Sequence, residues 1–249
     1  MDQNKEKEQK FWDDCAKKRV YAAFDKDEYD DIFNKAIGDF RGKKIIDIGC
    51  ASGVSAALLA TKGASVVGMD ISPELINQAK DLWKNSGLDL SFETGDAENL
   101  NHKDGSMDVC FFGGVIHHFP DKNKVIRECG RVLRPGGILL AIEPNRNDFF
   151  QRLNWKIARK RNLLTPNEDL VRPQEVSDLM EKYGLKNIKI TTFREHLSFL
   201  GLLFPWARKC FAEHGKTTFA EKIALFPVDL FRKNKLNKGN FLVIYGERA

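Results

Sequence analysis

Long apolar runs and a secretory leader are missing from this sequence. The apolar stretch at residues 197–207 is far shorter than the roughly 20 residues that a membrane-spanning helix requires. The first ten residues are polar and charged, without the apolar segment of a secretory signal. We therefore expect neither secretion nor a membrane-spanning helix.

Cysteine is also scarce and scattered. Its positions are odd in number and include no Cys-x-x-Cys pair; they are Cys15, Cys50, Cys110, Cys129 and Cys210. Disulfide frameworks and cysteine-based metal sites both need closer or better paired spacing. This pattern predicts free thiols, no bound metal and a cytoplasmic, reducing location.

A strong charge of one sign, internal repeats and low-complexity tracts are absent too. The 249 residues carry a net charge of +5 at pH 7, with 42% hydrophobic and 30% charged residues. A mildly basic chain permits an anionic partner without requiring one. This length is enough to bury a full core, so we expect a single α/β domain over residues 1–249.

The most informative stretch is residues 43–62, which predicts a strand, a turn and a helix. An isoleucine-rich run at 45–48 is typical of a strand that is covered on both faces. Gly49 and Gly53 follow, and glycine can adopt a positive φ and let a ligand approach the backbone closely. Residues 55–60 are then strongly helix-forming.

The turn differs from a dinucleotide-binding loop. Such a loop has the pattern Gly-x-Gly-x-x-Gly, whereas Ala51 and Val54 stand here at the second and third glycine positions. Asp47, two residues before Gly49, would repel a pyrophosphate but suits a ligand that carries an ammonium and a sulfonium group. The loop alone also fits an ordinary strand-to-helix turn. A Rossmann dehydrogenase stays open as an alternative that Asp47 disfavours.

Two further acids follow predicted strands. Asp70 ends the strand at 65–70, about 20 residues beyond the glycine loop, where a carboxylate accepts hydrogen bonds from ribose hydroxyls. Asp96 comes shortly after the strand at 88–94. One acid at a strand end is common, but acids at successive strand ends predict a shared ligand.

Residues 47–53, Asp-Ile-Gly-Cys-Ala-Ser-Gly, resemble motif I of the class I S-adenosylmethionine-dependent methyltransferases. The departure is Ala51, where the family usually has glycine. The resemblance of the Gly-Asp-Ala step at 95–97 implies that Asp96 accepts from the adenine amine and that the Ala97 N–H reaches a ring nitrogen. The implied cofactor is S-adenosyl-L-methionine, with S-adenosyl-L-homocysteine as product. The residues implied to bind it are Asp47, Gly49, Cys50, Ala51, Gly53, Asp70, Ile71, Asp96, Ala97 and Gly113.

Residues 107–119 are similar to the fourth-strand region of the ubiquinone/menaquinone-biosynthesis-like (methyltransferase type 11) branch of this family. A strand runs into Gly113, whose backbone is implied to approach the methionyl ammonium, and His117 and His118 follow. A turn at 133–137 is implied before the fifth strand. The implied fold is α/β and Rossmann-like, a doubly wound, seven-stranded, mostly parallel sheet with strand seven antiparallel, plus helical insertions.

Methyl transfer from a sulfonium is an in-line displacement that depends on positioning and on the exclusion of water. A base is needed only for an acceptor that is protonated at the working pH, and His117 and His118 are the candidates. The same pair also fits a purely structural role, with one histidine packed at a helix–strand junction and the other lining the pocket. Glu143 and Asn145, at the end of the fifth strand, are candidates to orient an acceptor.

We divide the chain into a helical N-terminal cap, a cofactor-binding core and two lid-like insertions, at residues 1–40, 41–145, 146–172 and 195–238. In the cap, Tyr21 or Tyr29 either contacts the ligand or covers the core. The first insertion mixes aromatic and basic side chains. That mixture fits a lid, a surface for an anionic or membrane-borne substrate, or a solvated helix face.

Three hypotheses for function remain. The apolar insertions favour a methyltransferase that acts on a small apolar or aromatic metabolite or a lipid-like acceptor. The alternatives are an RNA or protein methyltransferase and a non-catalytic S-adenosylmethionine-binding protein. No Asn/Asp-Pro-Pro-aromatic motif follows the fourth strand and no nucleic-acid module is evident, so methylation of nucleic-acid bases is disfavoured. The oligomeric state stays open.

Overall fold

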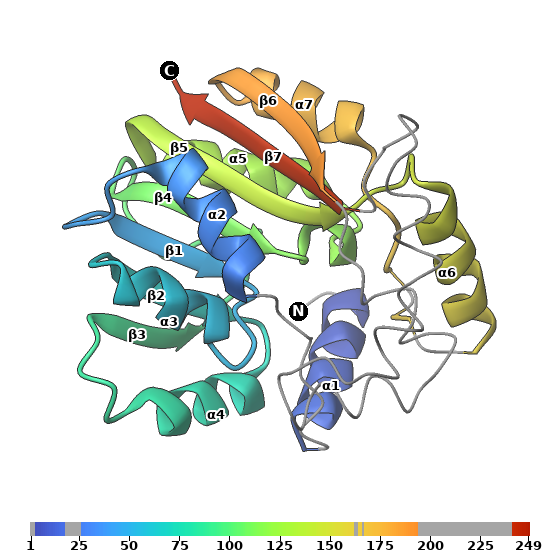
Figure 1. The fold of residues 1–249 in the computed structure, drawn as a ribbon. Helices are drawn as coiled ribbons and strands as arrows, with labels where there is room; N and C mark the ends of the chain where they lie inside the picture. The colour runs from blue at the N-terminus through green and yellow to red at the C-terminus, as the bar shows by residue number, and fades with distance from the viewer. Residues whose placement is uncertain (1–2, 18–25, 162–163, 166, 194–240) are drawn as a thin grey trace, which may run out of the picture.

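A single seven-stranded sheet organises the protein. The computed structural model describes residues 3–17, 26–161, 164–165, 167–193 and 241–249. The strands lie in the order β3-β2-β1-β4-β5-β7-β6 (Figure 1). Their bounds are Lys44–Ile48 (β1), Ser65–Asp70 (β2), Leu90–Thr94 (β3), Met107–Gly113 (β4), Leu133–Pro144 (β5), Leu185–Phe193 (β6) and Phe241–Arg248 (β7). β7 pairs antiparallel with β5 and β6, and the pairs among β1 to β5 are parallel, so the predicted fold is confirmed.

Helices connect the strands. They are α1 (Gln3–Lys17), α2 (Lys26–Ile37), α3 (Val54–Thr61), α4 (Pro73–Trp83), the 3₁₀ turn η1 (Ile116–His118), α5 (Lys122–Val132), α6 (Phe149–Lys160) and α7 (Pro173–Lys182). Three helices begin with a polar side chain that accepts a hydrogen bond from a backbone N–H of the first turn: Ser72 for α4, Asp121 for α5 and Asp148 for α6. Such caps satisfy donors that a helix start leaves without partners.

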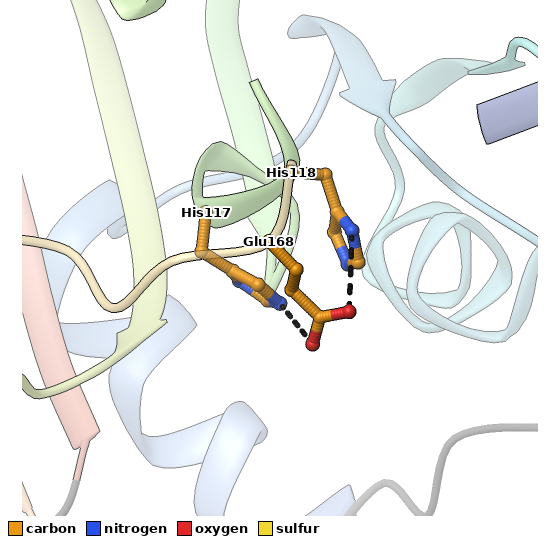
Figure 2. Close-up of side chains that lie close together, drawn as sticks. All are labelled: His117, His118 and Glu168. Atoms are coloured by element: carbon orange, nitrogen blue, oxygen red, sulfur yellow. Dashed lines mark ion pairs between the residues drawn. The ribbon is translucent and has the colours of Figure 1, made fainter. Parts of the chain in front are cut away.

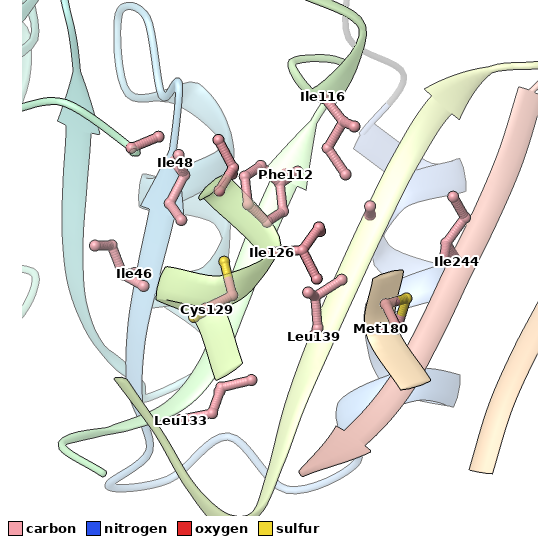
Figure 3. Packing of buried hydrophobic residues seen from close by; sticks show 14 of the residues in the cluster. Ile46, Ile48, Phe112, Ile116, Ile126, Cys129, Leu133, Leu139, Met180 and Ile244 are labelled. Carbon is pink, nitrogen blue, oxygen red and sulfur yellow. The ribbon is translucent and has the colours of Figure 1, made fainter. Parts of the chain in front are cut away.

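Both faces of the sheet are covered, and successive residues of a strand supply the two sides. In β4, Phe111 packs with Phe33 of α2, at a ring-centroid distance of 4.9 Å, whereas Phe112 belongs to the core on the opposite side. Ile126 of α5 and Met180 of α7 close this second side (Figure 3). The continuous apolar runs of the sequence are thus explained by burial on both faces.

The carboxyl ends of β1 to β4 form the edge that matters for function. The chain leaves β1 toward β2 and β3 on one side, and returns to β4 on the other, so a crevice opens between β1 and β4. Helix α1 lies beyond this edge rather than against a face of the sheet (Figure 1). Its Asp13 accepts a hydrogen bond from Ser72, and Gln78 of α4 donates to the carbonyl of Ala16 at 2.9 Å.

One expected turn is wrong. Residues 133–137 belong to β5, because Leu133 already pairs with Met107 of β4. The register then shifts, since Val109 pairs with Ile138, and Gly136 has φ 75° within the irregularity. The glycine signal marks a bulge inside a strand and not its beginning. Tyr21 and the insertion at 195–238 lie outside the described residues.

None of the helices within the described ranges is long and apolar enough to cross a membrane.

We expect Phe33→Ala to lower the free energy of unfolding by about 3–5 kcal/mol, because it empties a fully buried ring site between α2 and β4. Leu82→Ala on α4, whose side chain is 62% exposed, should change it by less than about 0.5 kcal/mol. Urea unfolding followed by circular dichroism measures both. Equal effects would mean that α2 does not dock as described.

Candidate active site

A cavity of about 270 Å³ lies at the carboxyl edge of the sheet. The loop after β1, the ends of β2 to β4 and helix α1 enclose it. Eight of the ten predicted cofactor residues line it: Gly49, Cys50, Ala51, Asp70, Ile71, Asp96, Ala97 and Gly113. Asp47 and Gly53 do not line the cavity. The structure therefore brings most of the predicted set together.

The loop after β1 depends on its glycines. Gly49 has φ 72°, and a Cβ there would lie 2.3 Å from Cγ2 of Val115. Gly53 has φ 80° and caps α3, and a Cβ there would lie 2.4 Å from the ring of Phe92. Ala51 keeps a left-handed conformation, with φ 47°, which strains a residue that has a side chain. Ala51, the departure from the family motif, thus adopts the left-handed conformation that glycine adopts more easily.

Asp47 lies beneath this loop and is almost completely buried. The hydroxyl of Ser55 donates to its Oδ2 at 2.5 Å. Burial raises the pKa of Asp47 to about 7, and the neighbouring charge of Asp70 adds to this effect, while the Ser55 hydrogen bond opposes it. Near neutral pH this carboxyl is poised between its two protonation states.

Asp70 holds the loop from the end of β2. Its Oδ2 accepts from the backbone N–H of Ala51 at 3.0 Å, and its Oδ1 from that of Ser72 at 2.9 Å. Burial raises the pKa of Asp70, although these N–H donors stabilise the ionised form. Each carboxylate oxygen has a further lone pair, so Asp70 can still accept from a ligand.

Helix α1 supplies a residue that the sequence did not reveal. Lys5 contacts Oδ2 of Asp96 at 2.6 Å and Oε2 of Glu98 at 2.7 Å. Burial alone would lower the pKa of Lys5, but the two carboxylates outweigh it and raise the pKa. Lys5 stands in a polar terminal stretch without any motif. Tyr29, one of the two predicted ring contacts from the cap, does line the cavity.

His117 is buried behind the cavity wall. Its Nδ1 lies 2.8 Å from Oε2 of Glu143, whose Oε1 accepts from the backbone N–H groups of Val115 at 2.9 Å and Ile116 at 2.7 Å. Burial lowers the pKa of His117, and the nearby His118 adds to this, so the neutral ring is favoured. Glu143 and Asn145 do not line the cavity, so this geometry does not let them orient an acceptor directly.

His118 does line the cavity. Its Nδ1 lies 3.0 Å from Oε1 of Glu8 and 3.9 Å from Oε2 of Glu168. Burial alone would lower the pKa of His118, but these carboxylates outweigh it and raise the pKa. The ring of Trp12 meets the imidazole edge to face at 5.3 Å. Glu8 and Glu168 were not predicted, because only the fold brings three distant segments to one histidine.

The antiparallel seventh strand, the acids at the strand ends and the crevice between β1 and β4 define a class of α/β enzyme that binds a cationic nucleoside. Comparison with protein families agrees, since residues 46–141 match the family described as "Methyltransferase domain".

Curated relatives extend the match beyond this region. The chain is 30% identical over 163 residues to "Ubiquinone biosynthesis O-methyltransferase" of Coxiella burnetii. The aligned part covers 63% of this chain and 69% of that protein. The enzyme of the same name from Vibrio parahaemolyticus is 30% identical over 170 residues, and the aligned part covers 64% of this chain and 70% of that protein. "Methyltransferase GfsG" of Streptomyces halstedii is 32% identical over 157 residues, and the aligned part covers 62% of this chain and 56% of that protein.

Solved structures agree on the fold. A putative sarcosine dimethylglycine methyltransferase from Galdieria sulphuraria superposes with a TM-score of 0.66 at 17% identity, covering 90% of this chain and 85% of that one. Phosphoethanolamine N-methyltransferase 2 of Haemonchus contortus, in complex with S-adenosyl-L-methionine, superposes with a TM-score of 0.64 at 17% identity. The superposition covers 89% of this chain and 52% of that one. This chain belongs to the S-adenosylmethionine-dependent methyltransferase family, in its ubiquinone/menaquinone-biosynthesis-like branch. It is an enzyme whose cofactor is S-adenosylmethionine.

We expect cofactor binding to tighten as the pH rises from 6 to 8. A cationic cofactor favours ionised Asp47, so binding lowers the pKa of about 7 and releases a proton. If that pKa falls well below 6 on binding, the affinity rises about tenfold over this range. Calorimetry in buffers of different ionisation enthalpy measures both the affinity and the proton.

Asp47→Asn should flatten this pH dependence. Asp39→Asn is the matched control, because the exposed Asp39 is paired with Arg41 and its pKa of about 2 keeps it ionised throughout the range. An unchanged slope in Asp47→Asn would assign the effect to another group.

Proposed function

We propose that this enzyme transfers the methyl group to an oxygen of a small, largely apolar acceptor, aromatic or lipid-like. The observation that carries the proposal is His118 at the cavity wall, between the carboxylates of Glu8 and Glu168. A hydroxyl must lose its proton to become a strong nucleophile, and an imidazole is suited to accept it. The relatives named as ubiquinone biosynthesis O-methyltransferases support an oxygen acceptor.

The cofactor is held by the loop and the strand-end acids in this proposal. Asp70 accepts from the ribose hydroxyls, Asp96 accepts from the adenine amine, and the Ala97 N–H donates to the ring. The backbone at Gly113 lies near the methionyl ammonium, and Ile71 covers the adenine. The loop formed by Gly49, Cys50, Ala51 and Gly53 gives the close backbone approach, and Asp47 below it supplies negative charge. When bound, S-adenosylmethionine supplies a methyl group on a positively charged sulfur.

The histidines have different tasks. His118 takes the proton from the acceptor hydroxyl, and the oxygen lone pair forms the bond to the methyl carbon. The carbon–sulfur bond breaks with its electron pair on sulfur, which gives S-adenosyl-L-homocysteine and the methyl ether. His117, fixed by Glu143, is a positioning residue whose ring packs against that of His118, with 4.2 Å between the ring centroids. Apolar groups on the cavity wall, among them Trp12, Tyr29 and Phe119, support an apolar acceptor.

The domain division and the surroundings of the cavity complete the proposal. Residues 1–40 act as a cap over the core at 41–145, and 146–172 and 195–238 act as lids. Within the described residues, Cys50, Cys110 and Cys129 are free thiols, which supports a reducing compartment such as the cytoplasm.

Helix α6 supports contact with an anionic membrane surface, from which a lipid-like acceptor would reach the cavity. Phe149 is 62% and Leu153 39% exposed, one turn apart, and the exposed Arg152 and Lys156 flank them. Apolar side chains next to cationic ones are typical of helices that lie in a membrane interface.

We expect His118→Gln to lower kcat by about 10²–10⁴-fold while cofactor affinity stays within about twofold, because the substitution removes only the base. His102→Gln is the control, since His102 forms a histidine–carboxylate pair with Glu93, which does not line the cavity. The assay follows labelled methyl from the cofactor into apolar phenols and into a metabolite extract. Label found only in RNA or protein, or binding without transfer to any acceptor, would support one of the two alternatives.

The double change Phe149→Ser with Leu153→Ser should weaken sedimentation with phosphatidylglycerol vesicles at least about tenfold, because about 25 cal/mol is lost per Å² of apolar area withheld from the bilayer. Leu82→Ser, at an exposed position on α4, should leave vesicle binding unchanged. If all variants bind alike, α6 is not the contacting surface.

A further inference from the structure

We infer that His117, His118 and Glu168 form a binding site for a divalent transition-metal cation, at the wall of the acceptor cavity. The chemical role of the cation rests on the proposed function above, whereas its binding does not. This inference replaces the expectation of no bound metal, which considered cysteine spacing alone.

The three side chains converge on one point. Their donor atoms all lie within 4.8 Å of one another. His117 Nε2 is 3.8 Å from Glu168 Oε1, and His118 Nδ1 is 3.9 Å from Glu168 Oε2 (Figure 2). Tetrahedral ligands of zinc lie roughly 3.4 Å apart. Shifts of at most about 0.7 Å in each side chain would therefore bring the three donor atoms to this spacing.

Metal-binding histidines commonly have a carboxylate at the ring nitrogen that does not bind the metal, and Glu143 occupies this place at His117. Glu143 is held by two backbone N–H groups and contacts His117 Nδ1. Nδ1 of His117 therefore carries the ring proton of the neutral form, and the lone pair of Nε2 faces the Glu168 carboxylate. Two electron-pair donors that face each other need a proton or a cation between them. A carboxylate behind the histidine also fixes the ring and strengthens it as a ligand.

The excess of negative charge around the two histidines also favours a bound cation. The residues Glu8, Glu143 and Glu168 are 8%, 0% and 8% exposed, and their carboxylates surround two imidazoles. Within the described part of the chain, no lysine or arginine forms an ion pair with any of them. Arg159 reaches only the backbone carbonyl of Glu168, at 2.6 Å.

Glu8 adds an independent observation. Its Oε2 is buried and has no hydrogen-bond partner among the described residues. A buried carboxylate oxygen without a partner is costly. A dication beside His118 would offset both this oxygen and the surplus of negative charge.

The donor set selects the kind of cation. Two imidazoles and one carboxylate suit zinc, iron(II), cobalt(II) or nickel(II), whereas magnesium and calcium prefer oxygen ligands only. His118 faces the cavity and His117 lies behind it, so an open coordination position would point toward the acceptor. With the cation bound, His118 Nδ1 would be a ligand and no longer the proton acceptor. The cation would instead favour the ionised acceptor oxygen, whose proton would pass to solvent before that oxygen attacks the methyl carbon. The leaving group remains the thioether.

The test uses the full, untagged chain, stripped with a chelator and free of cofactor. Zinc titration by calorimetry should give one equivalent with a micromolar or tighter Kd. Cobalt(II) should give visible absorption bands typical of mixed nitrogen and oxygen ligands. Glu168→Gln and His118→Gln should each weaken binding at least tenfold, and Glu143→Gln about 10–100-fold through its hold on His117.

Matched controls keep the result specific. Asp169→Asn changes the neighbouring acid, which pairs with Arg146, and His102→Gln changes a histidine elsewhere; both should bind the metal like the parent. Circular dichroism of each variant confirms folding. A stripped chain that takes up neither ion, or a loss in both controls, overturns the site, even if methyl transfer to an oxygen is found. A metal-binding chain without such transfer keeps the site and removes the proposed acceptor.

Discussion

Uncompensated negative charge at one edge of the sheet is the constraint on which this structure depends. Asp47 and Asp70 are buried next to each other below and beside the loop after β1, without a lysine or arginine in ion-pair contact within the described residues. Burial of charge is costly, and the structure meets that cost with backbone donors at Asp70 and with partial protonation at Asp47. A bound ligand with a fixed positive charge lowers the cost of burying both carboxylates.

The same arrangement repeats around the histidines. There the carboxylates of Glu8, Glu143 and Glu168 outnumber the two imidazoles. Asp47 and Asp70 on the cofactor side, and Glu8, Glu143 and Glu168 on the acceptor side, are thus acids without a lysine or arginine ion-pair partner within the described residues, whereas Asp96 is paired with Lys5. Positive charge has to arrive with the molecules that bind, and this favours their binding in an apolar, water-poor space.

The sequence predicted what is local or periodic. The isoleucine run, the glycine loop and Asp70 at a strand end are encoded within short windows, and they occupy the predicted places. Lys5, Glu8 and Glu168 were beyond reach, because each meets its partners only after segments far apart in the chain have packed. The expected turn at 133–137 failed for a related reason. Glycine marks a departure from regular backbone, but only the pairing with β4 decides whether a strand ends or bulges there.

The place of β7 has a consequence for how the protein is made. β7 lies between β5 and β6, although it follows β6 in the chain. During translation β6 therefore has no neighbour in the sheet until residues 241–248 leave the ribosome, and β5 keeps an open edge. The nascent chain has to carry two unpaired strand edges, which are sites for aggregation. Ribosome-associated chaperones thus have a defined stretch to protect, from the completion of β5 until β7 inserts.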